Sequence, residues 1–97
     1  MNRKKFDYPC LHVLVEGFEF DNRKFSEALY EYADEANITG SFKINNSFNT
    51  QMFLIGEIEN IYLKMIDPLS SEHCVNSIKI ERINNSRPEK EFIEIFD

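Results

Sequence analysis

The sequence predicts an α+β fold in which two helices pack against one face of a mostly antiparallel sheet. Two observations support this expectation. Segments in which apolar and polar residues alternate, as in strands, are interspersed with segments in which apolar residues recur every three or four positions, as in helices. The length of 97 residues suits one hydrophobic core, so we expect residues 1–97 to form a single domain.

The strand pattern occurs in five segments, which are residues 10–16, 41–45, 50–58, 75–83 and 91–96. The first is the clearest, because Leu11, Val13 and Val15 would share one face of a central strand. The Asn-rich residues 45–49 have the composition of a turn. The second and third strands should therefore form a hairpin.

Residues 23–36 have the spacing of an amphipathic helix. Their apolar side chains would face the core, and acidic side chains would occupy the opposite face. We expect Asp21 or Asn22 to cap the start of this helix, because a short side-chain oxygen can accept hydrogen bonds from the first free N–H groups. Gly40 is expected to close the turn that follows the helix.

A second, shorter helix is predicted over residues 59–66. It should end before Asp67 and Pro68, because a proline disfavours helical backbone in the residue before it. The order of elements is then β, α, β, β, α, β, β. This order predicts a ferredoxin-like βαββαβ sandwich with an extra C-terminal strand and right-handed crossovers.

The charge of the chain restricts its partners. A net charge of -6 argues against direct binding to nucleic acid or to an anionic membrane, because both depend on basic residues meeting phosphate. It favours a protein partner with a basic surface, although solubility alone explains it equally well. No apolar run approaches the length of a membrane span or of a signal segment, so we expect a cytoplasmic protein.

Cys10 with His12, and His73 with Cys74, supply residue types that bind zinc. The antiparallel strands predicted above place these two pairs near opposite ends of the sheet. We therefore expect no metal site, no cofactor and no disulfide, with both cysteines as free thiols.

Three stretches resemble the acylphosphatase family: VEGFEF at residues 15–20, ITG at residues 38–40 and FLIGEIEN at residues 53–60. The resemblance spans nearly the whole chain in element order, and it implies a phosphate-binding loop directly after the first strand. The loop residues would be Gly17, Phe18, Glu19, Phe20 and Asp21.

The resemblance also implies hydrolysis of carboxyl-phosphate bonds. In the family, loop amides and one arginine bind the phosphate, and an asparagine positions the attacking water, which holds the phosphoryl charge in place during attack. Here Asp21 stands where the arginine is expected, and the nearest guanidinium is that of Arg23. Ile44 stands at the asparagine position, with Asn45 one residue later.

Two acidic residues weaken the expectation of phosphate binding. Glu19 and Asp21 place negative charge in or beside the loop. A carboxylate about 4 Å from a phosphate costs on the order of 1 to 4 kcal/mol at surface-like dielectric constants. Arg23 could replace the missing arginine by turning into the loop from the helix start, or through an insertion, because the stretch between Gly17 and Gly40 is longer than the family's usual spacing. Asn45 could replace the asparagine only if a bulge turned it to the other face of the strand.

The predicted outer face of the first helix carries four acidic residues, Glu27, Glu31, Asp34 and Glu35. One interpretation is a solvated surface, and the other is a binding surface for a basic protein, which would gain specificity and association rate from complementary charge. Phenylalanines at loop tips could add apolar anchors or could simply pack locally, namely Phe18, Phe20 and Phe48.

The preferred hypothesis is a non-catalytic acylphosphatase-like protein that acts through protein binding, for example as an acidic inhibitor or decoy. The alternative is an acylphosphatase that uses Arg23 and Asn45 in displaced catalytic positions. A third hypothesis, a small-molecule or regulatory binding domain, has no pocket signature in the sequence. We expect a monomer or a dimer formed through an edge strand.

Overall fold

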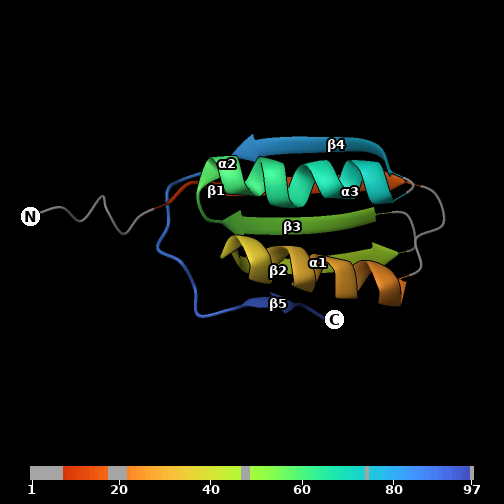
Figure 1. The fold of residues 1–97 in the computed structure, drawn as a ribbon, viewed down its shortest axis with the longest axis horizontal. Helices are drawn as coiled ribbons and strands as arrows, with labels where there is room; N and C mark the ends of the chain where they lie inside the picture. The colour runs from red at the N-terminus through yellow and green to blue at the C-terminus, as the bar shows by residue number, and fades with distance from the viewer. Residues whose placement is uncertain (1–7, 18–21, 47–48, 74, 97) are drawn as a thin grey trace, which may run out of the picture.

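A computed structural model of the chain describes residues 8–17, 22–46, 49–73 and 75–96 (Figure 1). Its elements are β1 (Cys10–Gly17), α1 (Asn22–Ala36), β2 (Thr39–Asn46), β3 (Asn49–Ile55), α2 (Ile58–Ile61), η2 (Tyr62–Ile66), α3 (Asp67–Glu72), β4 (Val75–Arg82) and β5 (Phe92–Glu94). Figure 1 shows α1 and the α2–η2–α3 segment side by side on one face of the sheet. The predicted α+β, ferredoxin-like architecture is confirmed.

The sheet has five strands in the order β4-β1-β3-β2-β5. All neighbouring pairs are antiparallel except β2 and β5, which are parallel. β5 is the extra C-terminal strand that was expected, and it covers the start of the outer edge of β2. β3 ends at Ile55, three residues before the predicted end, because the chain turns at Gly56 and the next helix begins at Ile58.

The core lies between the sheet and the two helical segments. Leu11, Val13 and Val15 on β1 are at most 1% exposed, as their alternation predicted. Phe25 and Leu29 on α1 face them and are equally buried. Burial of one face fixes strand register, because a slip of one residue would turn every apolar side chain outward.

The end of α1 differs from the prediction. The residue that ends the helix is Asn37, with a left-handed φ of 55°, whereas Gly40 lies three residues later, inside β2. Asn37 N–H donates to the Asp34 carbonyl at 3.4 Å, and Ile38 N–H donates to the Ala33 carbonyl at 2.9 Å. These two bonds form a Schellman motif, in which asparagine is the common substitute for glycine.

Gly40 lies inside β2, where it has a different reason to be glycine. Its φ is +123°, and a Cβ atom at this position would lie 2.0 Å from the carbonyl oxygen of Phe53 on β3. Only glycine allows the two backbones to approach this closely.

The second helical segment is longer than predicted and continues through Asp67 and Pro68. The turn directly before them, η2, is a π-helical turn. Pro68 cannot donate a backbone hydrogen bond, and the widened turn accommodates the residue that would otherwise end the helix. The inner side of the segment is buried through Ile61, Met65 and Leu69. No helix in the described part of the chain is long and apolar enough to cross a membrane.

Candidate functional site

The loop that the resemblance marks as phosphate-binding connects two well-placed elements. β1 ends at Gly17, which pairs with Val75 at the start of β4, and α1 begins at Asn22. β3 begins at the same end of the sheet, which we call the loop end. Several predicted site residues lie outside the described residues, namely Phe18, Glu19, Phe20, Asp21 and Phe48.

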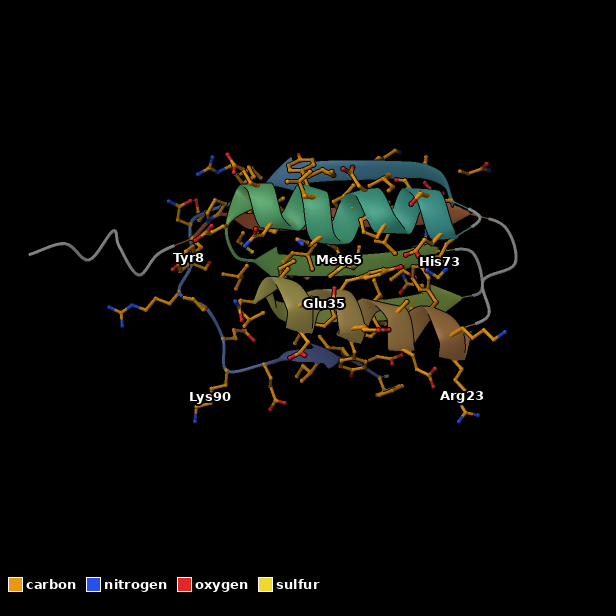
Figure 2. The ribbon with its side chains drawn as sticks, viewed as in Figure 1. Tyr8, Arg23, Glu35, Met65, His73 and Lys90 are labelled. Carbon is orange, nitrogen blue, oxygen red and sulfur yellow. The ribbon has the colours of Figure 1, made fainter. Side chains whose placement is uncertain are left out.

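Arg23, the candidate replacement for the family's arginine, lies in the first turn of α1. Its Nε atom is 3.6 Å from Oε1 of Glu27, one turn further along the helix, and its side chain is 90% exposed. Figure 2 shows the Arg23 side chain pointing away from the body of the molecule, whereas His73, at the same end, lies against it. The guanidinium group therefore contacts the outer helix face.

Asn45, the candidate replacement for the family's asparagine, lies near the end of β2. The strand pairing is irregular between Ile44 and Asn46, so the bulge considered above is present. The Asn45 side chain is nevertheless exposed, and its Nδ2 donates to Oδ1 of Asn49 at 3.0 Å. Ile44, at the family's asparagine position, is partly buried and packs against the core. The structure does not bring Arg23 and Asn45 together.

Two buried polar atoms at the loop end have no hydrogen-bond partner among the described residues. These atoms are Oγ1 of Thr50 and Nε2 of His73. Thr50 is fully buried and pairs with Val15 and Ile44 on its two neighbouring strands. The His73 ring packs edge-on against Phe25, with centroids 5.1 Å apart. Buried polar groups are nearly always satisfied, so unsatisfied ones are candidates for binding a ligand.

The acidic residues predicted as a partner surface all lie on α1 and are exposed, namely Glu27, Glu31, Asp34 and Glu35. Of these four, only Glu27 has an ion pair among the described residues, with Arg23. A hydrogen bond ties α1 to the other helical segment, because the Tyr32 hydroxyl donates to Oε1 of Glu72 on α3. The pKa of Tyr32 is raised, first by burial, then by this hydrogen bond, and by the charges of Glu72 and Glu31.

Neither a scan against protein-family models nor a search of curated proteins finds a match to the chain. Solved structures do match. An acylphosphatase from Coxiella burnetii has a TM-score of 0.78 and 22% sequence identity, covering 98% of this chain and 100% of that chain. An acylphosphatase from Bacillus subtilis has a TM-score of 0.69 and 14% identity, covering 91% of this chain and 99% of that chain. The chain has the acylphosphatase fold.

A larger protein contains a domain with the same acylphosphatase fold. Full-length HypF, in a structure described as phosphate- and nucleotide-bound, matches with a TM-score of 0.73 and 17% identity over 91% of this chain but only 12% of that chain. The fold thus occurs both as a whole protein and as one part of a longer one. Identities this low establish the fold and leave the chemistry to the residues of each protein.

On this acylphosphatase fold, the thiol and histidine pairs that resemble zinc ligands are far apart. Cys10 begins β1, and His73 precedes β4, which runs antiparallel to β1, so the two residues lie at opposite ends of the sheet. The Cys10 thiol is free and buried, and burial raises its pKa. His12 forms a 2.9 Å hydrogen bond with Gln51 and stacks on Phe53. Nowhere in the described residues do three His, Cys, Asp or Glu side chains gather as they would around a metal.

The arrangement of edge strands bears on the predicted edge-strand dimer. β5 pairs with Gly40, Ser41 and Phe42 at the start of β2, and no pairing covers the outer edge of β2 after Phe42 among the described residues. The outer strands are β4, with eight residues, and β5, with three. A dimer by strand addition could therefore use β4 or the uncovered end of β2, and the oligomeric state stays a prediction.

Neither Thr50 nor His73, which carry the two unsatisfied atoms, belongs to the site residues predicted from the sequence. Thr50 occupies a core-facing position in the alternation of β3, two residues before the buried Met52. A polar side chain at such a position is a signal that could have been noticed. His73 stands beside Cys74, which lies outside the described residues, and nothing in the local pattern indicates the contact between His73 and Phe25.

Proposed function

We propose that this acylphosphatase-fold protein acts in the cytoplasm by binding a protein with a basic surface, and that it does not hydrolyse acyl phosphates. Two features support the proposal, the placement of the candidate catalytic residues and the charge of α1. An acidic inhibitor or decoy, which occupies the basic surface of its partner, is one form that such a protein could take.

The observation that carries the proposal is that the arginine and asparagine candidates contact two different partners and not a shared site. Hydrolysis of the kind that the resemblance implies needs a fixed cation and an amide that converge on one phosphate. Arg23 instead contacts Glu27 on the outside of α1, and Asn45 contacts Asn49. The position that should supply the amide holds Ile44, which packs against the core.

The charge of α1 supports binding to a basic partner. Glu27, Glu31 and Asp34 lie on the outer side of one exposed helix, and the chain carries a net charge of -6. Carboxylates that face solvent attract a basic surface before contact and speed its association, and salt screens this attraction.

The first test is hydrolysis of benzoyl phosphate by the purified protein, with Arg23→Ala beside the wild type. We expect no turnover above buffer for either protein. Turnover at ordinary enzyme rates in the wild type, of about 1 per second or more, that is lost in Arg23→Ala would contradict the proposal and establish a displaced active site.

The second test concerns the surface, with a partner identified by affinity capture and then purified. The triple variant Glu27→Gln, Glu31→Gln, Glu35→Gln should associate at least about tenfold more slowly than the wild type at low salt. The control makes the same change in charge on other exposed surfaces, with Glu59→Gln, Asp67→Asn and Glu81→Gln. Equal losses in the two variants would assign the effect to net charge and not to α1.

One observation favours the alternative function, hydrolysis of carboxyl-phosphate bonds with Arg23 and Asn45 in displaced positions. The unsatisfied polar atoms of Thr50 and His73 lie at the loop end, where the resemblance places the phosphate. The assay with benzoyl phosphate separates the two functions directly, since the binding proposal predicts no turnover.

A further inference from the structure

A cavity of about 610 Å³ opens at the end of the molecule opposite the loop end, which we call the far end. Figure 2 shows two of its lining residues, Tyr8 and Lys90, on the side opposite to Arg23 and His73. The cavity lies within the usual size range of small-molecule sites, roughly 300 to 1,000 Å³. Its lining includes the charged and aromatic residues Tyr8, Tyr30, Asp34, Glu57, Lys90 and Glu91.

Backbone hydrogen bonds hold the walls of the cavity in place. Gly40 N–H donates to the carbonyl of Glu91 at 3.2 Å, and the N–H of Glu89 donates to Oγ1 of Thr39 at 3.0 Å. Tyr8 and Ser86 exchange two backbone hydrogen bonds of 2.8 Å each. The segment before β5 is therefore fixed both to β2 and to the start of the described chain, and the cavity is a feature of ordered backbone.

The charge around the cavity is mainly negative. Asp34, Glu57 and Glu91 line it, and none of them has an ion pair within the part of the chain that the structure describes. Lys90 also contributes to the lining, but Figure 2 shows its side chain pointing away from the body of the molecule. Carboxylates without a basic partner favour a cation in the space between them.

The end of α1 adds to this negative potential. Ala36 and Asn37, the last helical residue and the left-handed residue after it, both line the cavity. The C-terminus of a helix carries the equivalent of about half a negative charge. A positively charged group in the cavity would therefore meet favourable potential from both the side chains and the backbone.

Two tyrosines supply aromatic surface. Tyr30 is fixed because its hydroxyl accepts a hydrogen bond from the N–H of Glu94 at 2.9 Å, and its ring makes edge contacts with Phe42 and Phe92 at centroid distances of 5.4 and 6.0 Å. Tyr8 lines the cavity from the other end of the chain. Aromatic faces attract cations and also pack against the apolar stem that carries the charge.

We propose that this cavity binds an organic cation, a guanidinium or alkylammonium group on an apolar stem. The inference goes beyond the proposed function and does not depend on it, because only Asp34 of the three cavity carboxylates lies on α1, and Glu57 and Glu91 lie on other segments. Two sources share this chemistry: a free small molecule, and an arginine or lysine side chain of a basic protein. The experiment below distinguishes them.

The test uses two-dimensional amide NMR with L-arginine amide as the cationic probe and, as its counterpart, L-citrulline amide, which has the same α-amino group and lacks only the guanidinium charge. Arginine amide should shift the amide signals of cavity residues such as Thr39, Gly56 and Glu91 in a saturable way. Citrulline amide should bind at least about tenfold more weakly. Equal binding of the two probes, or no saturable shift with arginine amide at tens of millimolar, would overturn the proposal.

Variants matched in charge locate the site. The double variant Glu57→Gln with Glu91→Gln should bind arginine amide about tenfold more weakly than the wild type, because it lacks two exposed carboxylates of the lining. The double variant Glu27→Gln with Glu31→Gln makes the same change in charge on the outside of α1. It should weaken the binding of arginine amide less than about twofold. An equal loss of affinity in both double variants would overturn the proposal that the cavity is the binding site. It would indicate that the acidic protein attracts cations in general.

Two further comparisons identify the source of the cation. Tighter binding of an acetylated Gly-Arg-Gly amide than of arginine amide would assign the group to a protein side chain, and the reverse order would assign it to a small molecule. A control variant replaces the chain's own Arg3, Lys4 and Lys5 with Gln, to test whether one of these side chains is the cation. If arginine amide binds only to that variant, the chain supplies its own cation, and the proposal of an external ligand is wrong.

Discussion

The two ends of the sheet differ in what their polar side chains face. At the loop end, where the resemblance to acylphosphatases implies a phosphate site, Arg23 and Asn45 face solvent and Ile44 packs against the core. At the far end, Glu57 and Glu91, from segments far apart in the sequence, surround one cavity. A shared fold determines where strands and helices end, and the residues of each protein determine which end carries chemistry.

The largest expected effect tests the backbone of the far end. Gly40→Ala should destabilise the protein by about 3 to 5 kcal/mol, because its Cβ would lie 2.0 Å from the Phe53 carbonyl oxygen at a φ of +123°. Gly40 also holds the Glu91 carbonyl through its N–H. Urea unfolding followed by circular dichroism measures the loss.

Gly56→Ala is the matched control, since Gly56 also lines the cavity. A Cβ at Gly56 would meet its nearest atoms at 3.5 to 3.7 Å, which are ordinary contacts. Its stability should change by less than about 1 kcal/mol. Similar losses for the two variants would show that the close approach at Gly40 is not what requires glycine.

The next effect tests whether the loop end can be converted. Ile44→Asn supplies the amide that the resemblance implies, but it buries a polar group where an aliphatic one packs against the core. We expect a loss of about 1 to 3 kcal/mol and no hydrolysis of benzoyl phosphate, because Arg23 remains on the outside of α1. Ile44→Val, as control, should cost about 1 kcal/mol. Measurable hydrolysis by Ile44→Asn would show that the loop end lacks only the amide.

The helical layer that spans both ends can be tested through Tyr32. Tyr32→Phe removes the hydrogen bond to Glu72 and should cost about 0.5 to 1 kcal/mol at neutral pH. The pKa of Tyr32 is raised in the folded protein, so the neutral phenol is the form that folding favours. The wild type's advantage is therefore complete below the unfolded pKa of about 10 and declines as pH rises above it.

Urea unfolding at pH 7 and at several values above pH 9 measures this difference. Tyr62→Phe is the control, because Tyr62 is 39% exposed on the neighbouring helical segment. It should change stability by less than about 0.5 kcal/mol at every pH. An advantage of the wild type over Tyr32→Phe that grows with pH would contradict the assigned hydrogen bond.

The strands and helices that could be predicted from the sequence are those recorded in the local spacing of apolar and polar residues. The alternation of Leu11, Val13 and Val15 and the helical spacing of residues 23–36 correspond to one-sided burial, which a single segment records by itself. The order of these segments then restricts the topology to a few choices, and the five-stranded sheet is one of them.

Features that depend on contacts between distant segments could not be predicted. Gly40 needs to be glycine because Phe53 lies beside it, and that neighbour is known only after β2 and β3 pair. The far-end cavity brings together Tyr8, Asp34 and Glu91, which no spacing rule relates. The sequence showed acidic residues, and the structure places Glu57 and Glu91 around a cavity together with Asp34 at the end of α1, whereas Glu27 and Glu31 do not line it.

The smallest expected change in stability concerns two residues at the loop end, Arg23 and Asn45. Arg23→Ala should change the free energy of unfolding by less than about 0.5 kcal/mol, because its ion pair with Glu27 joins side chains that are 90% and 69% exposed. Asn45→Ala should be equally mild, since its hydrogen bond to Asn49 is also exposed. Unfolding in urea at low and high salt measures both. A loss above about 1.5 kcal/mol in either variant would mean that the side chain makes buried contacts at the loop end. Polar side chains would then face the interior at both ends of the sheet, and not only around the far-end cavity.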